Sequence, residues 1–132
     1  MSINKQIVKS YYENLWNNHD KSYIDRLFDN EIVFKGSLGV ETKGKEAFEA
    51  YFDMVSIAIP NLFHAVEQLV EEDDQVVARA WYSGRQTGKL FDFEASNNKI
   101  RYNGASFFII ENGKIKSIWV LGDIHSLYQQ IE

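Results

Sequence analysis

An Asn-Gly pair between two apolar runs is the feature that most constrains the fold of this chain. Asn112 and Gly113 divide the stretch from Gly104 to Asp123 into two segments rich in β-branched and aromatic side chains. A two-residue type I′ turn needs positive φ at both central positions, which asparagine tolerates and glycine adopts freely. The pattern therefore predicts a long β-hairpin with its turn at this pair.

The register of the hairpin follows from the turn. Counting outward places Trp119 opposite Ser106 on one face of the sheet. The same count places Asp123 opposite Tyr102 on that face. Both faces are apolar, so we expect helices of the same chain to cover one and further chain or a partner subunit to cover the other. A two-fold homodimer that buries the outer sheet face is the simplest arrangement.

The residues before the hairpin predict helices followed by strands. Apolar side chains recur at helical spacing in three segments, residues 7–16, 23–28 and 45–59. Two long strands, residues 62–71 and 75–86, follow and meet at an acidic turn. Helices first and antiparallel strands afterwards predict one α+β domain that spans the whole chain.

Composition narrows the classes of function. The 132 residues can bury a core unaided, and the absence of cysteine excludes disulfides and thiolate chemistry. The formal net charge of −5 is spread without a basic block, which argues against nucleic acid and membrane surfaces as partners. The N-terminus lacks the apolar run of a signal peptide, so we expect a cytoplasmic protein. Metal-binding and nucleotide-binding motifs are missing, so we expect neither a metal nor a cofactor.

Short motifs along nearly the whole chain resemble one known family. They are Tyr11-Tyr12, Leu15-Trp16-Asn17, Gly44-Lys45-Glu46-Ala47-Phe48, Pro60-Asn61-Leu62, Gly113-Lys114-Ile115, Trp119 and Asp123. With the order of elements, they make the chain similar to the SnoaL-like polyketide cyclases and ester cyclases of the nuclear transport factor two-like superfamily. The resemblance implies a cone-shaped fold in which a curved antiparallel sheet wraps around N-terminal helices. It also places Gln86 where many members carry a histidine.

The resemblance implies a small hydrophobic ligand, bearing a ketone, in the cone of a cofactor-independent cyclase or isomerase. Asp123 is the first candidate for the general base, which would abstract a proton from the carbon next to the carbonyl. His64 is the second candidate catalytic residue. The enolate oxygen then needs a hydrogen-bond donor, for which Tyr12, Tyr102 and Gln86 are also candidates.

Two aromatic side chains complete the predicted pocket. Trp16 on the first helix and Trp119 on the hairpin are expected to converge on one cavity with the candidate donors. Large rings at helical or strand spacing are also ordinary core residues, so this assignment depends on whether the cavity is open.

Several alternatives remain open from the sequence. Asp123 directly precedes the expected closing helix of residues 124–131 and would serve equally as its N-cap. A two-residue and a three-residue turn place His64 on opposite faces, so its orientation is not fixed. The same cavity could bind a hydrophobic ligand without chemistry, or the chain could be a dimeric interaction domain without a ligand.

Overall fold

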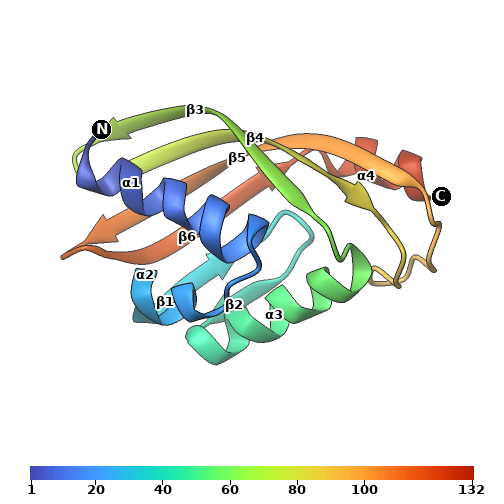
Figure 1. Ribbon diagram of the computed structural model, residues 1–132, viewed down its shortest axis with the longest axis horizontal. Helices are drawn as coiled ribbons and strands as arrows, with labels where there is room; N and C mark the ends of the chain where they lie inside the picture. The colour runs from blue at the N-terminus through green and yellow to red at the C-terminus, as the bar shows by residue number, and fades with distance from the viewer.

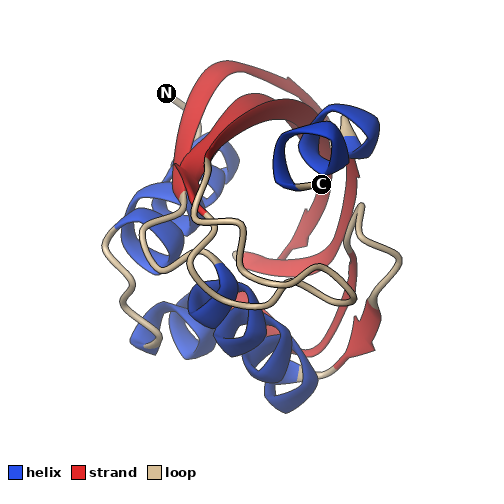
Figure 2. Cartoon of the chain, turned by 90° about the vertical axis from the view of Figure 1, so that its right-hand side faces the viewer, coloured by secondary structure: helices blue, strands red, loops and turns tan.

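A curved sheet of six strands forms the wall of the molecule in the computed structural model, which describes residues 1–132 (Figure 1). The strand order is β2-β1-β6-β5-β4-β3. The bounds are β1 Phe28–Lys35, β2 Glu41–Lys43, β3 Phe63–Glu72, β4 Gln75–Arg85, β5 Lys99–Glu111 and β6 Lys114–Gly122. Strands β1 and β6 are parallel and all other pairs are antiparallel, so the sheet is mixed and not wholly antiparallel as predicted. Figure 2 shows the sheet curling without closing.

Helices fill the inside of the curve, as the sequence predicts. Their bounds are α1 Ile3–Ser10, η1 Tyr11–Asn17, α2 Ser22–Leu27, α3 Lys45–Ala58 and α4 Ile124–Ile131. The main core joins the buried side chains of η1 and α3 to those on the inner face of the sheet. A second cluster, which includes Leu127 and Ile131 of α4, closes the other end of the curve. None of the helices is long and apolar enough to cross a membrane.

The first helical segment changes its hydrogen-bond pattern at Tyr11. In η1 the bonds skip one residue more than in an α-helix: the Asn18 N–H donates to the Glu13 carbonyl at 2.9 Å. Such π-helical turns are rare and occur frequently at functional sites. Here the wider turn buries two pairs of consecutive residues, Tyr11 with Tyr12 and Leu15 with Trp16.

The predicted hairpin turn is confirmed. Asn112 and Gly113 have φ angles of 52° and 75°, and Glu111 pairs with Lys114 across the two-residue loop. Positive φ at both positions is the backbone that a type I′ turn requires.

The register predicted beyond this turn is wrong, because β6 contains a β-bulge. Lys116 is an extra residue with no partner on β5, so every later residue of β6 is shifted by one. A shift of one residue exchanges the faces of a strand. Ser106 therefore pairs with Val120, while Trp119 pairs with Phe107 on the outer face, their ring centroids 5.6 Å apart.

Apolar side chains gather on the side of the sheet that faces away from the helices. They are Val33, Val70, Phe107, Trp119 and Leu121, all of them exposed. We call this set the outer apolar face. Its largest members, Trp119 and Phe107, are 42% and 43% exposed, and Leu121 is 61% exposed, so the rest of the chain covers them only in part.

Candidate active site

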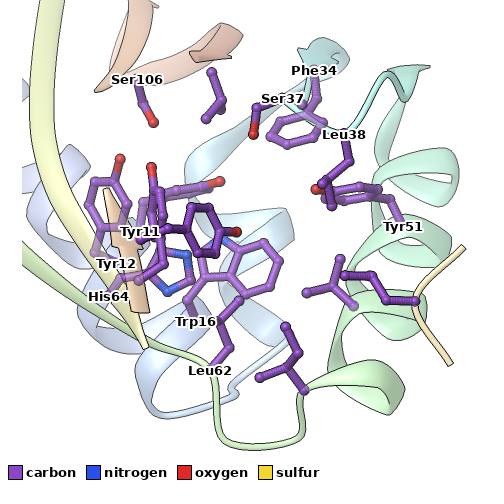
Figure 3. A pocket seen from close by; sticks show the side chains of 17 residues that line it. Tyr11, Tyr12, Trp16, Phe34, Ser37, Leu38, Tyr51, Leu62, His64 and Ser106 are labelled. Carbon is purple, nitrogen blue, oxygen red and sulfur yellow. The ribbon is translucent and has the colours of Figure 1, made fainter. Parts of the chain in front are cut away.

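A small cavity lies between η1, α3 and the inner face of the sheet, and most of its walls are apolar (Figure 3). The polar side chains that line it are Tyr11, Tyr12, Trp16, Ser37, Tyr51, His64, Tyr82, Tyr102 and Ser106. Its free volume is about 50 Å³. That is room for a few water molecules and well below the roughly 300–1,000 Å³ of small-molecule pockets.

Three neighbouring strands form one wall with a row of rings. His64 on β3 pairs with Tyr82 on β4, and Tyr82 pairs with Tyr102 on β5. The ring centroids of each neighbouring pair are 5.0 Å apart. Gly104 makes room for this row, because a Cβ there would lie 3.1 Å from the Tyr82 ring and 2.7 Å from the backbone oxygen of Leu121. The two-residue turn between β3 and β4 would by itself set His64 opposite Ser83. A β-bulge at Glu67, which has no partner on β4, shifts the register by one, sets His64 opposite Tyr82 and turns its side chain inward.

The helix η1 forms the opposite wall. The centroids of the Tyr12 and Trp16 rings lie 5.5 Å and 5.0 Å from the centroid of the His64 imidazole. Figure 3 shows the Ser37 and Ser106 hydroxyls reaching the same space from a loop and from β5. His64 is therefore surrounded by three aromatic rings, counting that of Tyr82, and is buried.

Asn17 holds the backbone of His64 in place. Its side-chain oxygen accepts from the His64 N–H at 2.7 Å, and its side-chain nitrogen donates to the His64 carbonyl at 2.9 Å. Strand β3 is an edge strand at this point, and an unpaired backbone edge is costly when it is partly buried. The Asn17 amide replaces the missing strand neighbour and fixes the position of the imidazole.

Burial sets the charge state of the titratable groups around the cavity. Loss of hydration lowers the pKa of His64 to about 3, so the imidazole is neutral at neutral pH. Burial also raises the pKa values of the Tyr12, Tyr51 and Tyr102 hydroxyls above the ordinary value. The cavity therefore presents one neutral imidazole, with one donor and one acceptor nitrogen, among phenols that stay protonated.

Unpartnered polar atoms concentrate at this cavity. Four buried side-chain polar atoms lack a hydrogen-bond partner, and three of them are Tyr12 Oη, Trp16 Nε1 and His64 Nδ1. Buried polar groups are nearly always paired, and an unpaired one destabilises the fold. Three on neighbouring side chains mark a place prepared for the polar atoms of a ligand or of bound water.

Four of the seven predicted site residues meet at the cavity, namely Tyr12, Trp16, His64 and Tyr102. Trp119 does not, because the bulge in β6 turns it to the outer apolar face. Asp123 does not line the cavity either: its carboxylate is exposed and accepts from the Ser126 N–H at 3.0 Å as the N-cap of α4. The predicted position of Asp123 opposite Tyr102 is wrong for the same reason as that of Trp119.

Gln86 is fully buried but binds the chain itself. Its side-chain nitrogen donates to the carbonyls of Gly88, Phe93 and Glu94 at 3.0, 3.3 and 3.1 Å. Its side-chain oxygen accepts from the Ser96 N–H at 3.0 Å. Both side-chain N–H donors of Gln86 are used by loop carbonyls, and the side chain does not line the cavity, so Gln86 organises the loop between β4 and β5 and does not contact a ligand there.

Sequence reasoning missed several residues of the site, namely Asn17, Ser37, Tyr51, Tyr82 and Ser106. Tyr82 could have been found only if both the two-residue β3–β4 turn and the β-bulge at Glu67 were known, because the turn alone sets Ser83 opposite His64. Asn17 could not, because its contact with His64 joins residues 47 positions apart.

Comparison with known proteins agrees with the fold. Residues 6–131 match the family model of the SnoaL-like polyketide cyclases, which confirms the resemblance seen in the sequence. No curated protein matches the chain in sequence.

Solved structures share the fold at low identity. A protein from Jannaschia sp. CCS1, assigned as a SnoaL-like polyketide cyclase, superposes with a TM-score of 0.91 at 18% identity, over 98% of this chain and 91% of that chain. TsrD from Streptomyces laurentii superposes with a TM-score of 0.85 at 24% identity, over 98% of this chain and 94% of that chain. IdmH from Streptomyces antibioticus, assigned as a polyketide cyclase, superposes with a TM-score of 0.83 at 15% identity, over 96% of each chain.

The buried imidazole predicts an acid-sensitive fold. An exposed histidine in the unfolded chain titrates near 6.5 and the folded His64 at about 3, so between these values the unfolded state binds more protons. Stability should therefore fall by about 2 to 3 kcal/mol as the pH drops from 6.5 to 4.5. Chemical denaturation at several pH values measures this loss. His64→Phe should remove it and the exposed His125→Gln should keep it; an equal loss in all three proteins would contradict the assignment.

The bonds of Gln86 predict a structural role. Gln86→Leu keeps the approximate volume but leaves three carbonyls and one N–H without their partner, which should lower the free energy of unfolding by about 2 to 4 kcal/mol. Gln129→Leu on the exposed face of α4 is the control and should change it by less than about 0.5 kcal/mol. Urea denaturation compares the two. A Gln86→Leu variant as stable as wild type would show that the loop does not need this amide.

Proposed function

The chain belongs to the SnoaL-like polyketide cyclase family, and we propose that it closes a carbon–carbon ring in a ketone-bearing ligand held in the central cavity, without a cofactor. The observation that carries this proposal is the convergence of three unpartnered polar atoms around one cavity. A ligand carbonyl would supply the missing acceptor for the Tyr12 hydroxyl and the Trp16 N–H.

His64 is the proton acceptor in this proposal. No carboxylate lines the cavity, and the imidazole is its only titratable group other than phenols. A carbon flanked by two carbonyls would lose its proton to the free imidazole nitrogen, and the electron pair of the C–H bond would become an enolate. The low pKa of His64 makes it a weak base, which restricts the substrate to such doubly activated carbons.

The phenols and the indole serve the oxygen that becomes negative. The Tyr12 O–H and Trp16 N–H are unpaired, buried and held by η1, so they can donate to the enolate without first breaking another bond. The enolate carbon then attacks a second carbonyl and forms the ring bond. The imidazolium returns its proton to the new alkoxide, which restores neutral His64 and balances the reaction.

Ligand entry requires one wall to move, because the free volume of about 50 Å³ is too small for a ring system. The segment 36–40 is the best candidate: it lies between β1 and β2, and it contributes Ser37 and Leu38 to the lining. A single turn, closed by the Gly36 N–H to Val40 carbonyl bond of 2.9 Å, holds it together. Movement of this segment would enlarge the cavity without disturbing the ring row on the sheet.

We further propose that two copies pair through the outer apolar face. Its exposed members lie on the adjacent strands β1, β6 and β5 and on β3, and Val77 on β4 pairs with both Phe107 and Val70, so they form a surface patch and not isolated side chains. Contiguous apolar patches of this kind mark interaction surfaces, and a two-fold pairing lets one patch cover its own copy.

The catalytic proposal is tested by exchange of ligand protons with solvent. Wild-type protein should accelerate deuterium incorporation at the central carbon of 2,4-diketo esters, measured by proton NMR, and mass spectrometry should detect the cyclised product. His64→Gln should slow both on the order of 10²- to 10⁴-fold. Asp123→Asn should leave both rates nearly unchanged, because asparagine caps a helix about as well as aspartate.

Other outcomes would separate the alternatives. Saturable quenching of tryptophan fluorescence without exchange would favour a binding module. Loss of turnover in Asp123→Asn, with His64→Gln still active, would return the role of base to Asp123.

The pairing proposal is tested by the mass in solution. Sedimentation equilibrium should give a dimer for wild type and a monomer for Trp119→Asp, because the new charge would be buried in the interface. Glu46→Lys changes an exposed charge on α3, on the other side of the sheet from the outer apolar face, and should leave the dimer intact. A wild-type monomer at high micromolar concentration would contradict the proposal.

A further inference from the structure

A second hollow lies on the outer face of the sheet, where β4 ends and β5 begins. Its volume is about 420 Å³, and its polar lining comes from Asn61, Ser83, Arg85, Lys99, Arg101 and Gln130. We call it the cationic hollow. It shares no residue with the central cavity and lies on the other side of the sheet, because the buried side chains of Tyr82, Ile100 and Tyr102 alternate with its cations along the strands.

The cations of the hollow are forced together by strand register. Arg85 pairs directly with Lys99, and Arg101 follows two residues later on the same face. Like charges directly opposite each other on neighbouring strands are destabilising. The sheet therefore carries an unfavourable cluster of three positive charges in a protein whose net charge is −5.

These three cations lack the carboxylate partners that other cations on this sheet have. Arg79, also on β4, pairs with Glu67 at 2.9 Å, and Lys116 on β6 pairs with Asp29 at 3.1 Å. No ion pair involves any cation of the hollow. The positive charge of the cluster is therefore available to an anion from outside the chain.

Neutral contacts hold the two guanidinium groups in place. Arg85 Nη1 donates to the Asn97 carbonyl at 2.6 Å, and the Arg101 guanidinium lies 3.7 Å from the centroid of the Trp81 ring. Neither contact cancels the positive charge, and each leaves further N–H donors free. Fixed, unneutralised guanidinium groups bind an anion with little loss of side-chain entropy.

We propose that the cationic hollow binds the phosphate group of a small ligand. Arginine forks match the oxygens of phosphate in pairs, and a third cation suits a group that carries more than one negative charge. The Ser83 hydroxyl and the side-chain nitrogen of Asn61 line the same hollow and can supply further donors. The volume of about 420 Å³ admits a phosphate with part of an attached organic group.

The test is isothermal titration of the full chain with pyrophosphate, inorganic phosphate, phenyl phosphate and acetate in low-salt buffer. We expect the three phosphate compounds to bind and acetate to bind at least tenfold more weakly. Tighter binding of phenyl phosphate than of inorganic phosphate would identify an organic phosphate as the ligand, and the reverse order a free phosphate. Equal binding of acetate, or no binding by any phosphate at 10 mM, would overturn the proposal.

Matched variants locate the site. Arg85→Gln with Lys99→Gln should weaken pyrophosphate binding at least tenfold, while Arg79→Gln on the same strand should change it less than twofold. Equal weakening by both would indicate a general charge effect and overturn the proposal.

Thermal melting keeps the test valid if the double variant folds poorly. Lys99→Gln alone should raise the melting temperature in low salt, because it relieves repulsion, and pyrophosphate should then stabilise it less than wild type. A lower melting temperature with full stabilisation by pyrophosphate would also overturn the proposal.

Discussion

One additional residue in β6 decides which side chains the two faces of the sheet carry. With Lys116 bulged out, Val120 faces the cavity and Trp119 faces outward. Without it, an exposed indole would enter a core that is already filled by aromatic rings, and the outer apolar face would lose its largest member. The inner cavity and the outer patch are thus set by the same local irregularity, which is a common use of bulges in sheets.

Side-chain amides make backbone hydrogen bonds at positions of the sheet that have no neighbouring strand. Asn17 pairs with both backbone groups of His64 beside the edge of β3. Gln130 does the same for Arg101 on β5, at 2.8 Å and 2.9 Å, beyond the last residue of β6. Each amide offers one donor and one acceptor, as a strand residue does. One of these clamps supports the imidazole of the central cavity, and the other supports an arginine of the cationic hollow.

The sequence was sufficient for the element order, the Asn112–Gly113 turn and the α+β class, because these depend on local periodicity and turn chemistry. It also identified four residues of the cavity, whose aromatic or imidazole side chains lie at helix or strand spacing. The errors at Trp119 and Asp123 share one cause. The predicted register is counted from the turn, and a bulge that the sequence does not reveal shifts the pairing of every residue after it by one. The prediction that Gln86 lines the cavity missed for a different reason. Its position in the family pattern suggested a ligand contact, whereas its four bonds to the loop depend on the three-dimensional fold.

The π-helical turn of η1 constrains the length of the first helical segment. A bond pattern that skips one residue more than an α-helix accommodates one more residue in the same turn, so η1 corresponds to an α-helix with a single-residue insertion. Deleting that residue would restore α-helical bonding but rotate the preceding side chains by about 100° relative to those that follow. The buried Val8 of α1 and Trp16 of η1 would then change their orientation relative to each other, so both could not keep their present places in the core. A change of one residue in the length of the first helical segment would therefore alter which of its side chains can be buried together.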